Sequence, residues 1–175
     1  MARIRKIGKY VNMADINNQV PDEGDIVALV ELLFFAYRDF TGDPDEILAA
    51  YGFGRAHHRV VHFVGRNPGM TVAALLDILR ITKQSLARVL KELVGGGFVG
   101  QKEGAADRRQ RLLYLTAKGE ALHRQLMSPQ VGRIKRALAE AGEGAYGHHR
   151  AVLLGLVEPE SREVVRRLIG SASAA

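Results

Sequence analysis

The chain has 175 residues, a length that suits one folded domain with short appendages and is enough to bury an apolar core. Hydrophobic residues make up 47% and charged residues 25%, proportions that argue against a disordered chain. Cysteine is absent, which excludes disulfides, thiolate metal sites and cysteine nucleophiles. The longest apolar stretch, residues 26–37, is too short to span a bilayer, and no signal-peptide core follows the basic N-terminus, so we expect a cytoplasmic protein without a membrane partner.

Charge is distributed unevenly along the chain. The net charge is +6 and the isoelectric point is about 9.8. Residues 13–53 include one basic and nine acidic residues, whereas residues 54–116 include eleven basic and four acidic residues, a net charge of +7. A polyanion such as nucleic acid would therefore be attracted to the middle of the chain.

The first third of the chain is predicted to be an arm followed by helices. Residues 1–23 are polar and basic. Residues 24–40 predict a helix with apolar side chains on nearly every face, and such a helix has to be covered by other elements. We expect Thr41–Pro44 to interrupt it, with Asp43 as the N-cap and Pro44 at the start of a short helix that ends near Tyr51.

The middle of the chain has the pattern of a helix-turn-helix. After a helix over 55–65 and a turn at 67–69, Thr71 is the predicted N-cap of a helix over 72–79. Arg80 and Ile81 form a turn, and Thr82 is the predicted N-cap of the next helix. That helix carries an inward apolar stripe at helical spacing: Leu86, Val89, Leu90, Leu93 and Val94. Two short capped helices joined by a tight turn are typical of this motif.

A hairpin and further helices follow the motif. Strands are predicted at 98–103 and 111–115 around the polar loop 104–110, and a hairpin in this position is called a wing. Thr116 is the expected N-cap of a helix that continues past Pro129 to about Ala141. Helices over 148–157 and 159–169 and a frayed tail complete the chain. The predicted fold class is mostly α with a small β-hairpin wing.

The outward face of the second motif helix carries side chains suited to DNA. Glutamine can pair in a bidentate manner with adenine and arginine with guanine, while threonine, serine or lysine can hold phosphate at a helix N-terminus. An ordinary solvated face is the alternative, but the paired helix, the wing and the cationic middle of the chain favour nucleic acid. The candidates are Thr82, Lys83, Gln84, Ser85, Arg88 and Lys91.

The wing supplies a second set of charged candidates. Arginine on a slender loop suits the narrow, electronegative minor groove, and a nearby carboxylate can hold a guanidinium in position. An ordinary charged loop is the alternative. The candidates are Lys102, Asp107, Arg108, Arg109 and Arg111.

Two other patterns carry little weight. Residues 95–100 match the string G-x-G-x-x-G, but they follow a helix and precede a strand, which is the reverse of a dinucleotide site. His58 and His62 lie four residues apart on one helix, yet no third ligand is evident for zinc. We therefore expect no cofactor, no metal and no catalytic residue.

Residues 71–119, TVAALLDILRITKQSLARVLKELVGGGFVGQKEGAADRRQRLLYLTAKG, resemble the winged-helix core of the MarR family of transcription regulators. The resemblance includes the Asp-x-Arg wing signature at Asp107 and Arg109, and with the flanking helices it covers about residues 24–157. It implies a homodimer that binds double-stranded DNA at a pseudo-palindromic operator, with Arg109 in the minor groove and Asp107 as its orienter. It also implies a small-molecule effector, for which the candidate residues are Phe34, Tyr37, Arg38, His57, His58 and His62.

The pattern and the resemblance together divide the chain into five parts. These are an arm (1–23), N-terminal dimerisation helices (24–53), a winged helix-turn-helix core (54–116), C-terminal dimerisation helices (117–170) and a tail (171–175). The function expected is a sequence-specific transcriptional regulator, most simply a repressor, and not an enzyme. Two alternatives stay open: a winged helix used only for contact with other proteins, and an enzyme with a histidine–carboxylate site.

Overall fold

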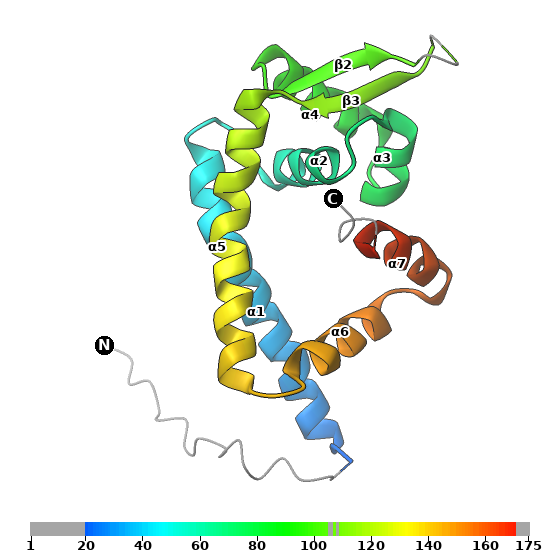
Figure 1. Cartoon of the computed structure of the whole chain (residues 1–175). Helices are drawn as coiled ribbons and strands as arrows, with labels where there is room; N and C mark the ends of the chain where they lie inside the picture. Colours follow the sequence, from blue (N-terminus) through cyan, green and yellow to red (C-terminus); the bar gives the residue numbers. More distant parts are fainter. Residues whose placement is uncertain (1–19, 105–106, 108, 171–175) are drawn as a thin grey trace. The chain divides into compact units, whose positions relative to one another are not determined.

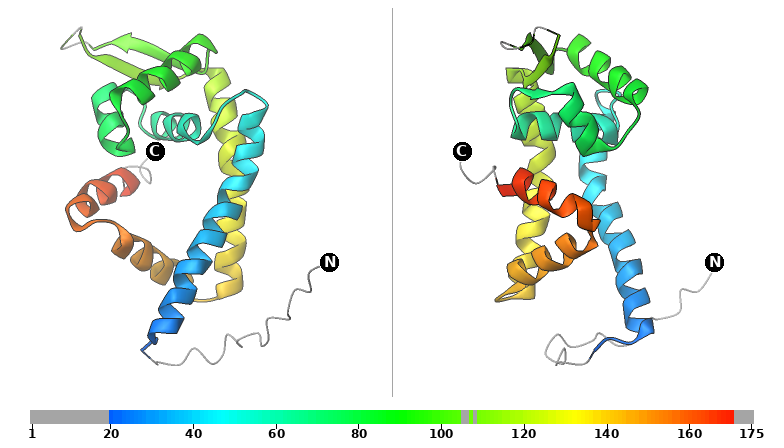
Figure 2. Two further views of the ribbon diagram at one scale, coloured as in Figure 1. Left: turned by 180° about the vertical axis from the view of Figure 1, so that it is seen from behind. Right: turned by 90° about the vertical axis from the view of Figure 1, so that its right-hand side faces the viewer.

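The computed structural model describes residues 20–104, 107 and 109–170. The described part of the chain divides into two units, one ending at Arg38 and the other starting at Asp39. The division falls inside α1 (Glu23–Ala49). Figures 1 and 2 show the elements, which are mostly helices with one small sheet, as the sequence predicts. In the described part, no helix is both long and apolar enough to cross a membrane.

The predicted interruption at Thr41–Pro44 is wrong, because α1 continues through it as one helix. A proline inside a helix leaves the carbonyl four residues earlier without its usual N–H donor. That carbonyl belongs to Phe40, and Nε2 of Gln130 in α5 (Ala117–Ala141) donates to it at 3.4 Å. Gln130 is only 7% exposed. A tertiary contact therefore supplies the donor that Pro44 removes.

The predicted N-cap role of Asp43 is also wrong. Asp43 lies inside α1, and its carboxylate accepts from Nη2 of Arg133 in α5 at 3.0 Å. Arg133 follows Gln130 by three residues, so both side chains project from one face of α5. The C-terminal part of α1 is thus joined to α5 by a buried hydrogen bond and an exposed ion pair.

The helix-turn-helix surrounds the main apolar core. It consists of α3 (Val72–Leu79) and α4 (Lys83–Gly95), packed on α2 (Arg55–Arg66) and the first half of α5. Burying each aliphatic side chain completely contributes about 1.5–3 kcal/mol to the stability of the fold. The most deeply buried residues are Leu48, Val60, Val61, Val64, Leu75, Leu86, Leu93, Leu113 and Leu126.

Three predicted threonine N-caps are confirmed. The hydroxyl oxygens of Thr71, Thr82 and Thr116 each accept the backbone N–H three residues later, at 3.1 Å. Each cap satisfies an N–H that a helix start would otherwise leave unpaired. The starts of α3, α4 and α5 are therefore set by local sequence.

The predicted wing is confirmed and gains a third strand. β2 (Val99–Glu103) and β3 (Arg111–Leu115) pair antiparallel, with Gln101 opposite Leu113. β1 (Met70–Thr71) pairs with the other edge of β3, giving the order β1-β3-β2. Two residues are too few to show a strand pattern, so β1 was not predicted.

The C-terminal segment forms three short elements. α5 passes Pro129 without interruption, and α6 (Ala145–Leu156) begins three residues before the predicted start at His148. A 3-10 turn, η2 (Pro159–Ser161), leads into α7 (Arg162–Gly170). In Figures 1 and 2, α7 lies beside α3, and side chains of both helices line one pocket.

Replacing Gln130 tests how Pro44 is accommodated. Gln130→Met keeps the volume but removes the donor to Phe40, so we expect a loss of about 1 kcal/mol in the free energy of unfolding. An alanine at position 44 would have an N–H that can bond the same carbonyl, so the loss should be smaller in a Pro44→Ala background. Urea denaturation of the four proteins measures both values, and equal losses in the two backgrounds would contradict this account.

Candidate nucleic-acid interface

The outward face of α4 is polar and exposed. Leu86, Leu90 and Leu93 are buried in the core, so the opposite side of the helix faces solvent. Exposed on that side are Lys83, Gln84, Ser85, Arg88 and Lys91. No hydrogen bond or ion pair joins the side chains of Lys83, Gln84, Arg88 or Lys91 to another described residue. Their donors are therefore available to a partner.

The start of α4 is ordered by two hydroxyl groups. Thr82 Oγ1 accepts the N–H of Ser85 and donates to Ser85 Oγ at 2.8 Å. Both residues remain exposed, so the N-terminus of α4 is open to solvent. An exposed helix N-terminus with lysine beside it attracts phosphate.

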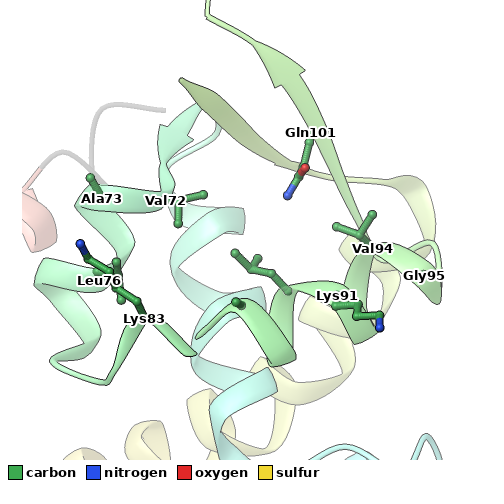
Figure 3. Close-up of a pocket in the computed structure, with 10 residues that line it drawn as sticks. Val72, Ala73, Leu76, Lys83, Lys91, Val94, Gly95 and Gln101 are labelled. Carbon is green, nitrogen blue, oxygen red and sulfur yellow. The ribbon is translucent and has the colours of Figure 1, made fainter. Parts of the chain in front are cut away.

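A groove of about 800 Å³ runs between α3, α4 and β2 (Figure 3). Its walls are mainly apolar, and its polar side chains are Lys83, Lys91 and Gln101. Val94, which the sequence stripe placed in the core, is 37% exposed and lines this groove instead. The groove shows that the two motif helices and the wing face one common space. Gln101 was missed because its position depends on how the wing packs on α4.

The basic residues of the wing differ in their partners. Arg111 Nη1 is 2.9 Å from Oε1 of Glu103, its cross-strand neighbour, and Lys102 Nζ lies 4.9 Å from the centre of the Tyr114 ring. Arg109 is exposed, and no described residue contacts its guanidinium. The predicted site residue Arg108 lies outside the described residues.

Among the described residues, Asp107 bonds to the backbone of the wing. Its Oδ1 accepts the N–H of Arg109 at 2.9 Å, and among the described wing residues no ion pair joins the two side chains. Gly104 N donates to Gln110 O, and a Cβ on Gly104 would come within 2.8 Å of the carbonyl oxygen of Asp107. Asp107 and Gly104 therefore shape the turn that carries Arg109.

Comparison with known proteins identifies the family. A model of the MarR family matches residues 51–110. The HTH-type transcriptional regulator PetP of Rhodobacter capsulatus is 47% identical over 133 residues, which cover 76% of this chain and 80% of PetP. The chain belongs to the MarR family. It is a DNA-binding transcriptional regulator and not an enzyme.

Two solved structures share the fold at low sequence identity. FabT of Streptococcus pneumoniae, in complex with DNA, has a TM-score of 0.64 and 19% identity over 75% of this chain and 94% of FabT. A variant of MarR from E. coli, complexed with operator DNA, has a TM-score of 0.58 and 20% identity over 79% of this chain and 100% of that protein.

His57 links α2 to α4 in this MarR-family chain. Its Nδ1 accepts the N–H of Gly54 at 3.1 Å, so the ring hydrogen is on Nε2, which donates to Glu92 of α4 at 2.7 Å. The ring is 8% exposed and stacks on Phe53 at 4.4 Å between centroids. His57 therefore ties α4 to the start of α2. A histidine at the third position of a helix whose N-cap is glycine is the local signal for this role.

The residues predicted to bind an effector fall in both units. Phe34 is 68% and Tyr37 45% exposed, and the Arg38 guanidinium lies 5.1 Å from the centre of the Phe35 ring; all precede Asp39. The three candidate histidines lie on α2 in the other unit. The effector site of this regulator therefore stays a prediction.

His62 and His123 form a ring pair between α2 and α5. His62 Nδ1 is 3.3 Å from His123 Nε2. Burial, with smaller contributions from repulsion by His123, His58 and Arg66, lowers the pKa of His62 to about 4. Burial is also the main cause of the lowered pKa of His58 and of His123. Within residues 20–104, 107 and 109–170, no three acidic or histidine side chains group closely enough to hold a metal ion.

The low pKa of His62 predicts a loss of stability in acid. The unfolded ring has a pKa near 6.5, so between pH 6.5 and 4 the unfolded chain binds the proton that the folded chain excludes. The contribution is full above pH 6.5 and is lost as the pH falls toward 4. His62→Gln should reduce the fall in unfolding free energy between pH 7 and pH 5 by about 1–2 kcal/mol in urea titrations. His149→Gln, at an exposed position on α6, is the matched control for replacing a histidine by glutamine.

Proposed function

We propose that this regulator binds a pseudo-palindromic operator as a homodimer and represses transcription by occupying it. The observation that carries the proposal is the exposed polar face of α4, whose cationic side chains Lys83, Arg88 and Lys91 no described residue neutralises, next to the groove that α3, α4 and β2 line. In this proposal α4 lies in the major groove and the wing reaches the neighbouring minor groove. The names of two structurally similar regulators, which state that they are in complex with DNA, are consistent with it.

Within α4, some side chains are proposed to contact phosphate and others to contact base edges. Thr82, Lys83 and Ser85 lie at the helix N-terminus, where backbone N–H groups and a lysine charge favour phosphate. Gln84 and Arg88 are exposed about one turn apart and can form bidentate pairs with base edges. Lys91 lies one turn further along α4 and is proposed to contact the phosphate backbone of the DNA. Phosphate contacts fix the register, and base contacts supply sequence preference.

Within the wing, Arg109 is the proposed minor-groove residue. Its guanidinium has no partner among the described residues, whereas that of Arg111 is paired with Glu103. A cation that is already paired gains less from phosphate or from the negative potential of a narrow minor groove. Lys102, which lies over Tyr114, is proposed to contact the backbone.

Dimerisation is supported by apolar surface on α1. Leu29, Leu32, Phe34 and Phe35 are 55–68% exposed in the single chain. Isolated exposed apolar residues are ordinary, but a contiguous run on one helix marks an interface. A second copy of the chain is the simplest cover, and two-fold symmetry suits an operator with two half-sites.

The remaining parts of the proposal follow from the family. A small-molecule effector that releases DNA is proposed from the behaviour of MarR-type regulators, with Phe34, Tyr37, Arg38, His57, His58 and His62 as the candidate contacts. We also propose a cytoplasmic location, because the protein has to reach an operator on the chromosome.

Arg88→Ala tests base reading. The variant should lose about 1–3 kcal/mol of discrimination at one position of each half-site, because a bidentate base contact is removed. Binding selection from random duplexes followed by sequencing measures this preference. Absence of binding by the wild-type protein to any duplex at low salt would instead favour the protein-contact alternative.

Arg109→Ala tests the wing, with Arg111→Ala as the matched control. Removing Arg109 should weaken operator binding and reduce the slope of log affinity against log salt by about one, because one phosphate-proximal cation is lost. Arg111→Ala should weaken operator binding clearly less, because the guanidinium of Arg111 is already paired with Glu103. Equal affinities of wild type and Arg109→Ala across a salt titration would remove Arg109 from the interface.

Leu32→Glu tests the dimer surface on α1. Burying the new carboxylate against a second copy is unfavourable, so the variant should shift to monomer in light scattering and lose operator binding. Val20→Glu, at a position 93% exposed before the helix begins, should stay dimeric. An unchanged dimer for Leu32→Glu would place the interface elsewhere.

A further inference from the structure

The C-terminal segment contacts the turn of the helix-turn-helix at one short hydrogen bond. Arg80, in the turn between α3 and α4, donates from Nη2 to Oγ of Ser161 in η2 at 2.6 Å. The two residues are 81 positions apart in the chain. Neither the wing nor α5 takes part, so this contact links η2 and α7 directly to the helix-turn-helix of the same chain.

Arg80 has a backbone conformation that favours glycine. Arg80 has φ 50° and ψ 43°, and it is the one non-glycine residue with positive φ in the described part of the chain. Glycine is the residue that adopts this left-handed conformation without steric cost, and it is common at helix C-termini. An unfavourable residue at such a position points to a function for its side chain.

The surroundings of this hydrogen bond are loosely packed. A pocket of about 410 Å³ lies between α7 and the pair α2 and α3, lined on one side by Phe63 and Ile78 and on the other by Val165 and Leu168. Asp77 and Glu160 also line it, yet no ion pair joins either carboxylate to Arg80 among the described residues. Because apolar packing across the joint is incomplete, the bond between Arg80 and Ser161 is the close contact that sets the turn against η2.

We propose that Arg80 is a positioning residue for DNA reading and that η2 and α7, the C-terminal brace (residues 159–170), hold the turn through it. Thr82, two residues after Arg80, caps α4, and Ile81 between them packs against the core. A fixed guanidinium at position 80 therefore fixes the start of α4, where the proposed phosphate and base contacts begin. The inference rests on the proposed function and gives the last helix a role beyond dimerisation.

Ser161→Ala is the decisive variant, because it removes the acceptor without touching the turn. The probe is a duplex of roughly two to three helical turns, selected from random sequence with the wild-type protein. Ser161→Ala should bind it about three- to tenfold more weakly, as expected for loss of one typical intramolecular hydrogen bond. Ser161→Thr, which keeps the hydroxyl, should restore binding. Arg166→Ala, which removes a charge from α7 away from the turn, is the control and should bind like wild type.

Arg80→Gly separates positioning from simple stability. Glycine relieves the left-handed backbone, so the melting temperature should stay equal or rise, while DNA binding falls as far as in Ser161→Ala. The double variant should be no weaker than either single variant, because both remove the same contact. A thermally stabilised Arg80→Gly protein with wild-type affinity would overturn the proposal. Weak binding by Arg80→Gly but not by Ser161→Ala would also overturn it, since Arg80 would then contact DNA itself.

Hydrogen exchange measured without DNA tests the brace independently of the proposed DNA binding. Ser161→Ala should speed amide exchange at residues 80–85 relative to wild type and to Arg166→Ala, whether or not any duplex binds. Unchanged exchange there would overturn the brace even if operator binding is demonstrated. Failure of the wild-type protein to select any duplex would instead refute the proposed function.

Discussion

The anchoring of α4 by its apolar side is the constraint on which the rest of the molecule depends. Leu86, Val89, Leu90 and Leu93 are almost fully buried against α2, α3 and the sheet. A helix of 13 residues has little stability by itself, so this burial is what holds it. Because the apolar side of α4 is fixed against the core, the opposite, cationic side faces solvent.

Several contacts outside the apolar core restrict α4 further. The hydrogen bond between Thr82 and Ser85 orders the first turn of α4. In the second half of α4, Glu92 bonds to His57, which lies on α2. The bond from Arg80 to Ser161 fixes the turn that precedes α4. A reading helix has to be placed to within a fraction of an ångström of the base edges, and contacts at its start, middle and preceding turn are a physical means to that end.

The cationic side chains and the exposed apolar side chains lie on different elements. The middle of the chain is cationic, and among its described side chains those of Lys83, Arg88 and Lys91 on α4 and of Arg109 in the wing form no ion pair. The longest run of exposed apolar side chains is on α1, where nine large ones are 45–68% exposed in the single chain. In the proposed function, attraction to a polyanion and burial against a second copy of the chain therefore depend on separate elements, so each can be altered without directly removing the other.

The sequence alone determined the features that depend on neighbouring residues. The threonine caps, the apolar stripe of α4, the two longer wing strands and the exposed polar face all follow from spacings of two to four residues. The structure confirms them except at Val94, the last residue of the stripe, which is 37% exposed. Only the tertiary structure decided the features whose causes lie far apart in the chain. Pro44 remains inside α1 because Gln130 reaches Phe40 across 90 positions, and two-residue β1 exists because β3 offers it an edge. Arg80 tolerates a glycine-like backbone beside a serine 81 residues away. Such partners leave no local periodicity, because each depends on how whole helices pack rather than on the residues beside it.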